Sequence, residues 1–199
     1  KTIKKLIDLK KKNIAVVLPQ EFTWQGYEDR MSGWRDAHFE KDIIVKQSLI
    51  CRPTKNKKFS SESEIGYEEV TRLINKKIKF DAIFALNDLL AMGCYQAAKE
   101  KKLEIPKDFS ILGFDNSVTA FNLRPTLSSI QLPIAEMTSK AIEHIFGDKN
   151  YDSVCLAPDF AHIKTKAPIT DYSMIYFLNP HNIHGVNILP WPIHDYSRD

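Results

Sequence analysis

The sequence predicts an α/β fold with a doubly wound parallel sheet. Two observations lead to this prediction: short apolar runs alternate with segments of helical periodicity, and the apolar runs lack an inside–outside alternation. A strand that is apolar on both sides is covered on both faces, which is typical of parallel sheets with crossover helices. The chain of 199 residues is long enough to bury one such core, and nothing in it resembles two separate domains.

Short apolar runs, several of them rich in β-branched residues, are predicted as strands. The first, "IAVVLP", is followed by a loop that contains Gly26. The second, "DIIVKQSLI", leads into a polar stretch, and "LSSIQL" is a further candidate near the end. In order, the runs occupy residues 14–19, 42–50, 82–86, 109–114 and 127–132.

Helical spacing of apolar residues marks the segments that follow these runs. One pattern passes through Met31, Trp34 and Phe39, after the first strand. An Ala-rich segment follows the third strand, and the last segment has Pro133 in its first turn, where a missing N–H costs nothing. Beyond the first pattern, the predicted helices cover residues 66–78, 88–102 and 133–146.

Composition and charge argue against several classes of protein. The formal net charge is +3, and the lysine-rich start is interpreted as a solvated surface rather than a nucleic-acid contact. Cys51, Cys94 and Cys155 are odd in number and far apart, which argues against a disulfide framework or a zinc knuckle and favours a reducing cytoplasm. No apolar stretch reaches membrane-spanning length, so we expect a cytoplasmic protein without membrane contact.

Sequence motifs of catalysis and cofactor binding are absent. The sequence has no Walker loop, no G-x-G-x-x-G after the first strand, no G-x-S-x-G elbow and no H-E-x-x-H. His181, His184 and His194 lack Cys, Asp or Glu at ligand spacing, so no metal site is expected there. We therefore expect neither an enzyme nor a bound cofactor.

Three polar residues are predicted to lie at the carboxyl edge of the sheet. Asn87 and Asp115 each follow a predicted strand, and Arg30 lies in the opening turns of the first of these helices. Ligands bind at this edge in open parallel sheets because loops and helix N-termini converge there. A guanidinium, an amide and a carboxylate together predict a site that recognises hydroxyl groups. Each residue also has an ordinary explanation: a helix cap for Asn87 or Asp88, a turn for Asp115 and a surface cation for Arg30.

The motifs "NDLLAMG", "IPKDFSILGFDN" and "LRPTLSSI", in this order, resemble the effector-binding region of the lactose/galactose-repressor (LacI/GalR) family of bacterial transcription regulators. The similarity extends upstream through "YEDRMSGWRDA" and covers roughly residues 3–146. It implies a periplasmic-binding-protein-like fold of type I, mostly one of two lobes that close on a small effector such as a sugar or a nucleobase. It also implies that Arg30, Asn87 and Asp115 contact the effector. Trp24 matches a further contact position, where it would stack on a sugar ring or simply cap the core.

The sequence departs from the family pattern at several positions. Ser61 stands where relatives often carry an aromatic residue, with Phe59 close by but out of register. Leu132 stands where a Gln is common. These departures leave the identity of the effector open.

The resemblance also implies a domain organisation. Residues 1–170 would form the C-terminal lobe of the effector-binding domain, with no helix-turn-helix pattern before residue 13. The helix at 134–146 would pack in the other lobe, so its apolar face lacks its usual partner; that face comprises Ile134, Met137, Ala141 and Ile145. Residues 171–199 do not resemble the family and are interpreted as an irregular tail of unknown role.

These features together predict the small-molecule-sensing region of a transcriptional regulator, which would reach DNA only through a helix-turn-helix absent from this chain. The resemblance implies a homodimer through segments 89–99 and 117–124. Two other functions stay open: a solute-binding protein of a sugar transport system, and a vestigial lobe without a ligand. The candidate dimer contacts, for which the core is the alternative, are Leu90, Cys94, Phe121 and Leu123.

Overall fold

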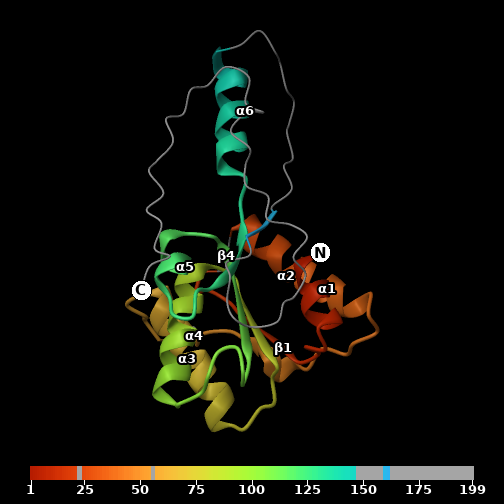
Figure 1. Cartoon of the computed structure of the whole chain (residues 1–199), viewed down its shortest axis with the longest axis vertical. Coiled ribbons are helices and arrows are strands. Elements are labelled where there is room, and N and C mark those ends of the chain that lie inside the picture. Colours follow the sequence, from red (N-terminus) through yellow and green to blue (C-terminus); the bar gives the residue numbers. More distant parts are fainter. Residues whose placement is uncertain (22–23, 55–56, 147–158, 162–199) are drawn as a thin grey trace, which may run out of the picture. The chain divides into compact units, whose positions relative to one another are not determined.

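The computed structural model describes residues 1–21, 24–54, 57–146 and 159–161 (Figure 1). These residues contain a six-stranded sheet with the strand order β2-β1-β3-β4-β5-β6. The first five strands in this order run parallel, and β6 is antiparallel to β5. The predicted parallel α/β fold is confirmed. The strands are β1 (Ile14–Val17), β2 (Ile50–Cys51), β3 (Ala82–Ala85), β4 (Ser110–Asp115), β5 (Ser128–Gln131) and β6 (Asp159–Ala161).

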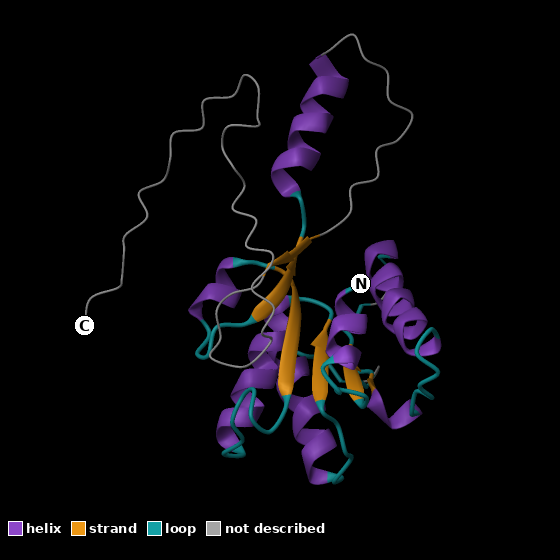
Figure 2. Cartoon of the chain, turned by 45° about the vertical axis from the view of Figure 1, so that its right-hand side comes forward, coloured by secondary structure: helices purple, strands orange, loops and turns teal. Residues whose placement is uncertain are grey.

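The winding direction of the chain reverses at β1, which pairs with β2 on one side and β3 on the other. Right-handed crossovers that run in opposite directions place their helices on opposite faces of the sheet. Accordingly, α1 (Thr2–Asp8) packs on α2 (Gln25–Phe39), whereas α3 (Glu62–Asn75) packs on α4 (Asp88–Glu100). Figure 2 shows helices on both sides of the strands.

The remaining helices follow the later strands. They are α5 (Val118–Asn122) after β4 and α6 (Ile134–Phe146) after β5, and a short 3₁₀ helix (Gln47–Leu49) precedes β2. No residue of α6 is buried, and the apolar face predicted for it is exposed along its length. Of the helices described, none has the length and apolarity needed to cross a bilayer.

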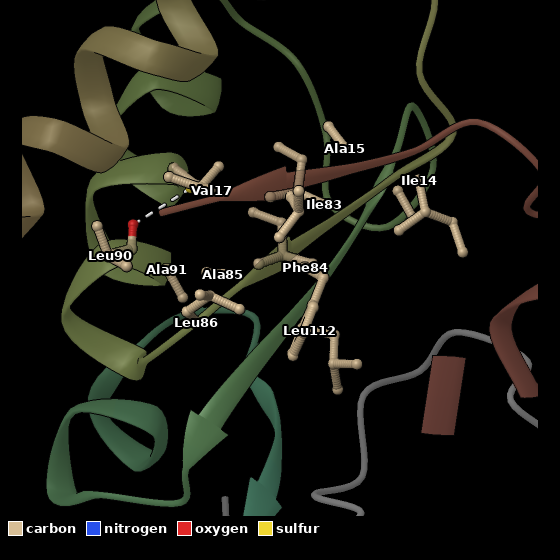
Figure 3. Packing of buried hydrophobic residues seen from close by; sticks show 14 of the residues in the cluster. Ile14, Ala15, Val17, Ile83, Phe84, Ala85, Leu86, Leu90, Ala91 and Leu112 are labelled. Atoms are coloured by element: carbon tan, nitrogen blue, oxygen red, sulfur yellow. Dashed lines mark hydrogen bonds between the residues drawn. The ribbon is translucent and has the colours of Figure 1, made fainter. Parts of the chain in front are cut away.

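The core is built on β1 and β3, whose residues are buried along the whole length of both strands (Figure 3). This burial on both faces is why the two strands are apolar without alternation. Met31 and Trp34 of α2 and Leu90 and Cys94 of α4 are fully buried in the same cluster.

A close approach of α3 and α4 depends on a glycine in each helix. A Cβ atom on Gly66 would lie 2.0 Å from the carbonyl oxygen of Leu90, and one on Gly93 would lie 1.8 Å from the carbonyl oxygen of Ser63. Any side chain at either position would force the helices apart. The contact fixes the N-termini of both helices side by side, and these N-termini carry residues of the site described below.

One local prediction was wrong, and one helix was not predicted. The run 42–50 was expected to be a strand, but only Ile50 and Cys51 pair with β1, and Ile44 is 92% exposed. The pairing of β1 with β2 starts at Val16, so residues 43–46 have no partner strand in this register. None of the lysines of the lysine-rich start is buried, in line with the solvated surface expected there, but the helix α1 within this segment was not predicted.

Several predictions concern residues outside the described ranges. They are the tail 171–199, Cys155, and the three histidines at positions 181, 184 and 194.

Candidate functional site

The predicted site residues lie at the carboxyl edge of the sheet, where the winding reverses between β1 and β3. This reversal is where ligands bind in open α/β sheets, because the loops leaving the two strands diverge there and leave a crevice. Arg30 is on α2, the helix that follows β1, and Asn87 is the N-cap residue of α4, just after β3. Asp115 is the last residue of β4.

Arg30 contacts both neighbouring segments. Its Nη1 donates a hydrogen bond to the carbonyl oxygen of Leu86, and its Nη2 lies 3.3 Å from Oδ1 of Asp115. The guanidinium carbon lies 3.6 Å from the centroid of the Phe114 ring. Only 7% of the Arg30 side chain is exposed, so it is not the surface cation that the ordinary explanation assumed.

The oxygen and the nitrogen of the Asn87 side-chain amide make different contacts. Its Oδ1 accepts a hydrogen bond from the backbone N–H of Leu90 at 2.8 Å, which caps α4. Its Nδ2 donates to Oε2 of Glu62 at 2.7 Å and to the hydroxyl of Tyr27 at 3.3 Å. The capping explanation is therefore correct for the oxygen, while the amino group faces the residues of the candidate site.

Asp115 lies in a turn with unusual backbone geometry. Its φ is 106°, and that of Asn116 is 50°, both in the region that L-residues rarely occupy. Burial, together with the nearby carboxylates of Asp88 and Glu62, raises the pKa of Asp115 to about 6 despite the opposing effect of Arg30. Burial likewise lowers the pKa of Arg30. For both groups, the loss of hydration outweighs the attraction between them.

Asp88 holds this turn in place. Its side chain is buried, and its Oδ2 accepts hydrogen bonds from the backbone N–H and the hydroxyl of Ser117 at 2.7 and 2.9 Å. Its Oδ1 accepts a hydrogen bond from the Ser129 hydroxyl at 2.6 Å. A Cβ atom on Gly113 would lie 2.3 Å from the same Oδ1, so glycine is needed for the carboxylate to fit. Asp88 thereby ties α4 to β5 and to the turn that positions Asp115.

A pocket of about 390 Å³ lies beside these residues. Of the four residues predicted to bind a ligand, only Trp24 lines it. Tyr27 and Glu62 connect the pocket to the rest of the site, because both line it and both contact Asn87. The lining residues are Pro19, Gln20, Glu21, Trp24, Tyr27, Phe59, Ser61, Glu62 and Ile65.

Trp24 is 56% exposed, so it does not cap the core. Its ring lies edge-on to Tyr27, with 5.2 Å between the ring centroids. The guanidinium carbon of Arg30 is 5.1 Å from the Trp24 ring and 5.3 Å from the Tyr27 ring. The two aromatic rings therefore contact Arg30 and also line the pocket.

Sequence reasoning missed Tyr27 and Glu62. Tyr27 is one helical turn before Arg30, so the i, i+3 relationship could have indicated it. Glu62 opens α3, whose start was predicted four residues too late, at Gly66.

The positions that depart from the family pattern lie in or near the site. Ser61 and Phe59 both line the pocket, and the Ser61 hydroxyl accepts a hydrogen bond from the backbone N–H of Glu64 at the start of α3. Leu132 packs against the core, whereas the neighbouring Gln131 accepts a hydrogen bond from the Asn116 amide at 3.3 Å.

The candidate dimer contacts are divided between core and surface. Leu90 and Cys94 are fully buried, because the glycine contact between α3 and α4 covers them, so they are unavailable to a partner chain. Phe121 is 52% exposed and Leu123 is partly buried. The segments also expose Leu89 and Val118, which sequence reasoning did not single out.

Among the residues that the structure describes, no three His, Cys, Asp or Glu side chains are grouped as metal ligands would be. The buried thiols of Cys51 and Cys94 are free, and burial raises the pKa of Cys51 to about 12.

Comparison with known proteins identifies the family to which this chain belongs. Residues 3–151 match the family model of the periplasmic binding protein-like domain. The HTH-type transcriptional regulator DegA of Bacillus subtilis is 37% identical over 134 residues, which are 67% of this chain and 37% of DegA. The chain belongs to the LacI/GalR family. Its matched segment spans less than half the length of such curated relatives, which are transcription regulators rather than enzymes.

Solved structures of LacI-family proteins have the same fold. A regulatory protein from Chloroflexus aggregans superposes with a TM-score of 0.70 at 28% identity, covering 80% of this chain and 57% of that protein. A sugar-binding transcriptional regulator from Escherichia coli, solved with phosphate, superposes with a TM-score of 0.68 at 25% identity, covering 81% and 57% respectively. This LacI/GalR-family chain thus corresponds to a single lobe of a periplasmic-binding-protein-like domain.

Proposed function

We propose that this chain is the effector-sensing part of a bacterial transcription regulator. Its effector would be a small hydroxylated molecule, a sugar or a nucleobase-like compound, bound by Arg30, Asn87, Asp115 and Trp24. Family membership supports the regulatory role, and the similar E. coli regulator is described as sugar-binding. In this proposal the effector domain comprises residues 1–170, and the tail 171–199 has a separate, unassigned role.

The convergence of three polar groups carries the proposal. Arg30 and Asp115 are 85 residues apart in sequence, yet their side chains are in contact. Arg30 also reaches the carbonyl oxygen of Leu86, directly before Asn87. Three separate strand–helix connections thus bring a guanidinium, an amide and a carboxylate to one edge of the sheet, beside a pocket.

The geometry suits a ligand with neighbouring hydroxyl groups. The 3.3 Å contact between Arg30 and Asp115 is longer than the roughly 2.7–2.9 Å typical of a charge-assisted hydrogen bond. A hydroxyl can donate to the Asp115 carboxylate and accept from the Arg30 guanidinium, so it would satisfy both groups better than they satisfy each other. The exposed Trp24 ring would then cover the apolar face of the ligand.

Regulation would follow from unequal binding to two states. An effector that contacts this lobe and an opposing lobe favours the closed arrangement only if it binds that arrangement more tightly. In a cytoplasmic regulator, closure would reach DNA through a helix-turn-helix outside this chain and through a homodimer. We place the dimer contact on the exposed residues of segments 89–99 and 117–124, namely Leu89, Val118 and Phe121.

Calorimetric titration with a panel of sugars and nucleobases tests the proposal. We expect heat of binding from at least one compound, and loss of that heat in Arg30→Ala. Arg35→Ala is the matched control, because Arg35 is exposed on the same helix. Since Arg30 also bonds Leu86, an unfolding curve of each variant checks that the fold is retained. Equal heats in both variants would contradict the proposed role of Arg30, and no heat from any compound would favour the vestigial lobe.

The gene sequence upstream of the Lys1 codon separates the regulator from a transport protein. We expect a helix-turn-helix coding region there. A signal-peptide sequence in that position would instead show a solute-binding protein.

A further inference from the structure

The pocket beside Arg30 has carboxylates and aromatic rings in its wall. Glu21 and Glu62 are its charged lining residues, and Trp24, Tyr27 and Phe59 supply the rings. Among the described residues that line it, none is Lys, Arg or His. A neutral sugar does not require this excess of negative charge, whereas a positively charged ligand is attracted by it.

The charge balance of the pocket is negative. Helices α2 and α3 begin at the pocket, and each helix N-terminus contributes about half a positive charge. The two full negative charges of Glu21 and Glu62 exceed the sum of these two partial positive charges. The carboxylate of Glu62 accepts a hydrogen bond from the Asn87 amide, which is neutral and leaves the negative charge in place.

Two of the cations near the pocket have carboxylate partners. Arg30 is paired with Asp115, and Lys57 is paired with Glu68. Lys57 also lies 5.0 Å from the centroid of the Phe59 ring, on the pocket's margin.

The aromatic rings are placed for contact with a positive charge. Both rings already contact one cation, because the Arg30 guanidinium carbon lies 5.1 Å from the Trp24 centroid and 5.3 Å from the Tyr27 centroid, within the roughly 6 Å of a cation–π interaction. The Trp24 ring also lies against Gly26, where a Cβ atom would be 2.3 Å from it. Gly26 therefore leaves room for the Trp24 ring in its position at the pocket, and more than half of Trp24 stays exposed.

We propose that the effector carries a positively charged amine as well as hydroxyl groups, as an amino sugar does. The ammonium group would lie in the pocket between Glu21 and Glu62, against Trp24 and Tyr27. The hydroxyl groups would reach Arg30, Asn87 and Asp115. This inference rests on the proposed function and specifies the class of effector.

Titration with matched sugar pairs tests the inference. Glucose and galactose are each compared with the 2-amino sugar, the N-acetylated 2-amino sugar and the 6-phosphate. We expect at least one amino sugar to bind about tenfold more tightly than its neutral parent, the gain of one charge-assisted hydrogen bond, and the N-acetyl form to lose this advantage. In Glu62→Gln, which keeps an acceptor for Asn87, the ratio of amino-sugar affinity to neutral-sugar affinity should fall below about threefold, whatever the change in affinity for the neutral sugar.

Glu104→Gln is the matched control, because Glu104 is an exposed residue in the loop after α4 and the substitution changes the net charge equally. A preference that falls equally in both variants would overturn the assignment to Glu62. Equal binding of amino and neutral sugars, or tighter binding of the 6-phosphates, would overturn the inference and leave the proposed function intact. No binding in any pair would overturn both.

Discussion

Asp88 shows how one buried side chain can set the geometry of a site without facing the ligand. Its carboxylate accepts three hydrogen bonds, from the backbone and hydroxyl of Ser117 and from the hydroxyl of Ser129. These bonds join the start of α4 to the turn after β4. Because Asp115 lies at the other end of that turn, the orientation of Asp115 toward Arg30 depends on Asp88.

Asp88→Ala is expected to lower the free energy of unfolding by about 3 kcal/mol, because one buried and two partly buried donors lose a charged acceptor. Urea denaturation measures the loss. Asp108→Ala is the control: its exposed carboxylate accepts one backbone hydrogen bond, from Glu104, and should cost less than about 1 kcal/mol. An equal decrease in the free energy of unfolding of the two variants would show that the Asp88 contacts contribute no more to stability than one exposed hydrogen bond does.

Asp115 should make stability depend on pH in an unusual direction. Its pKa is about 6 in the folded protein against a usual value of 3.8, so the folded state holds its proton more tightly than the unfolded state. Its contribution to stability is therefore fully present below about pH 4 and is lost as the pH rises through about 6. The effect is small because 38% of the side chain is exposed and screened by solvent.

Denaturation of the wild type and Asp115→Asn at pH values from 4 to 7 isolates this contribution. We expect the stability of the wild type relative to the variant to decrease with rising pH. A difference that increases instead would mean that the pairing with Arg30 outweighs burial.

At the scale of the elements, the packing of α3 on α4 sets the spacing of the site. Gly66→Ala should destabilise the protein by at least about 2 kcal/mol, because the new methyl group would meet the backbone of Leu90 at 2.0 Å. Gly33→Ala is the matched control in α2, where nothing lies within 4 Å of the added Cβ atom. It should instead stabilise by about 0.5–1 kcal/mol through helix propensity. If Gly66→Ala leaves the free energy of unfolding unchanged, the two helices can separate at little cost.

The succession of elements was largely predictable from sequence because local periodicity determines it. Two exceptions show that the local sequence pattern does not decide every element. Residues 42–50 have the composition of a strand, but pairing is decided by β1, which offers a partner only from Val16 onward. In α1, Ile3, Leu6 and Ile7 follow helical spacing, but the surrounding lysines obscured that pattern.

The candidate site was predictable in part for a similar reason. The rule that ligands bind at carboxyl ends of parallel strands selected Arg30, Asn87 and Asp115 without coordinates. Tyr27 and Glu62 could not be selected that way, because their role depends on contacts with Asn87 across the fold. The double use of the Asn87 amide, as a cap and as a donor toward the site, likewise appears only in three dimensions.

For the molecule as a whole, a single lobe provides one wall of a site. The described residues of this wall include a pocket, an aromatic pair and a paired arginine and aspartate. Because an opposing wall would exclude water and add contacts, this chain alone should bind its effector more weakly than a complete two-lobed protein does. Affinities of this chain and of a two-lobed LacI-family protein, measured with a sugar that both bind, test this expectation. Equal affinities would show that the effector needs only the wall described here.

A crystal structure of the chain with the tightest-binding sugar of the panel tests the central claim most directly. We predict that the sugar occupies the pocket lined by Trp24, with hydroxyl oxygens within about 3.2 Å of the Arg30 guanidinium and the Asp115 carboxylate. A sugar bound at another surface, with Arg30 and Asp115 still paired only to each other, would contradict the account.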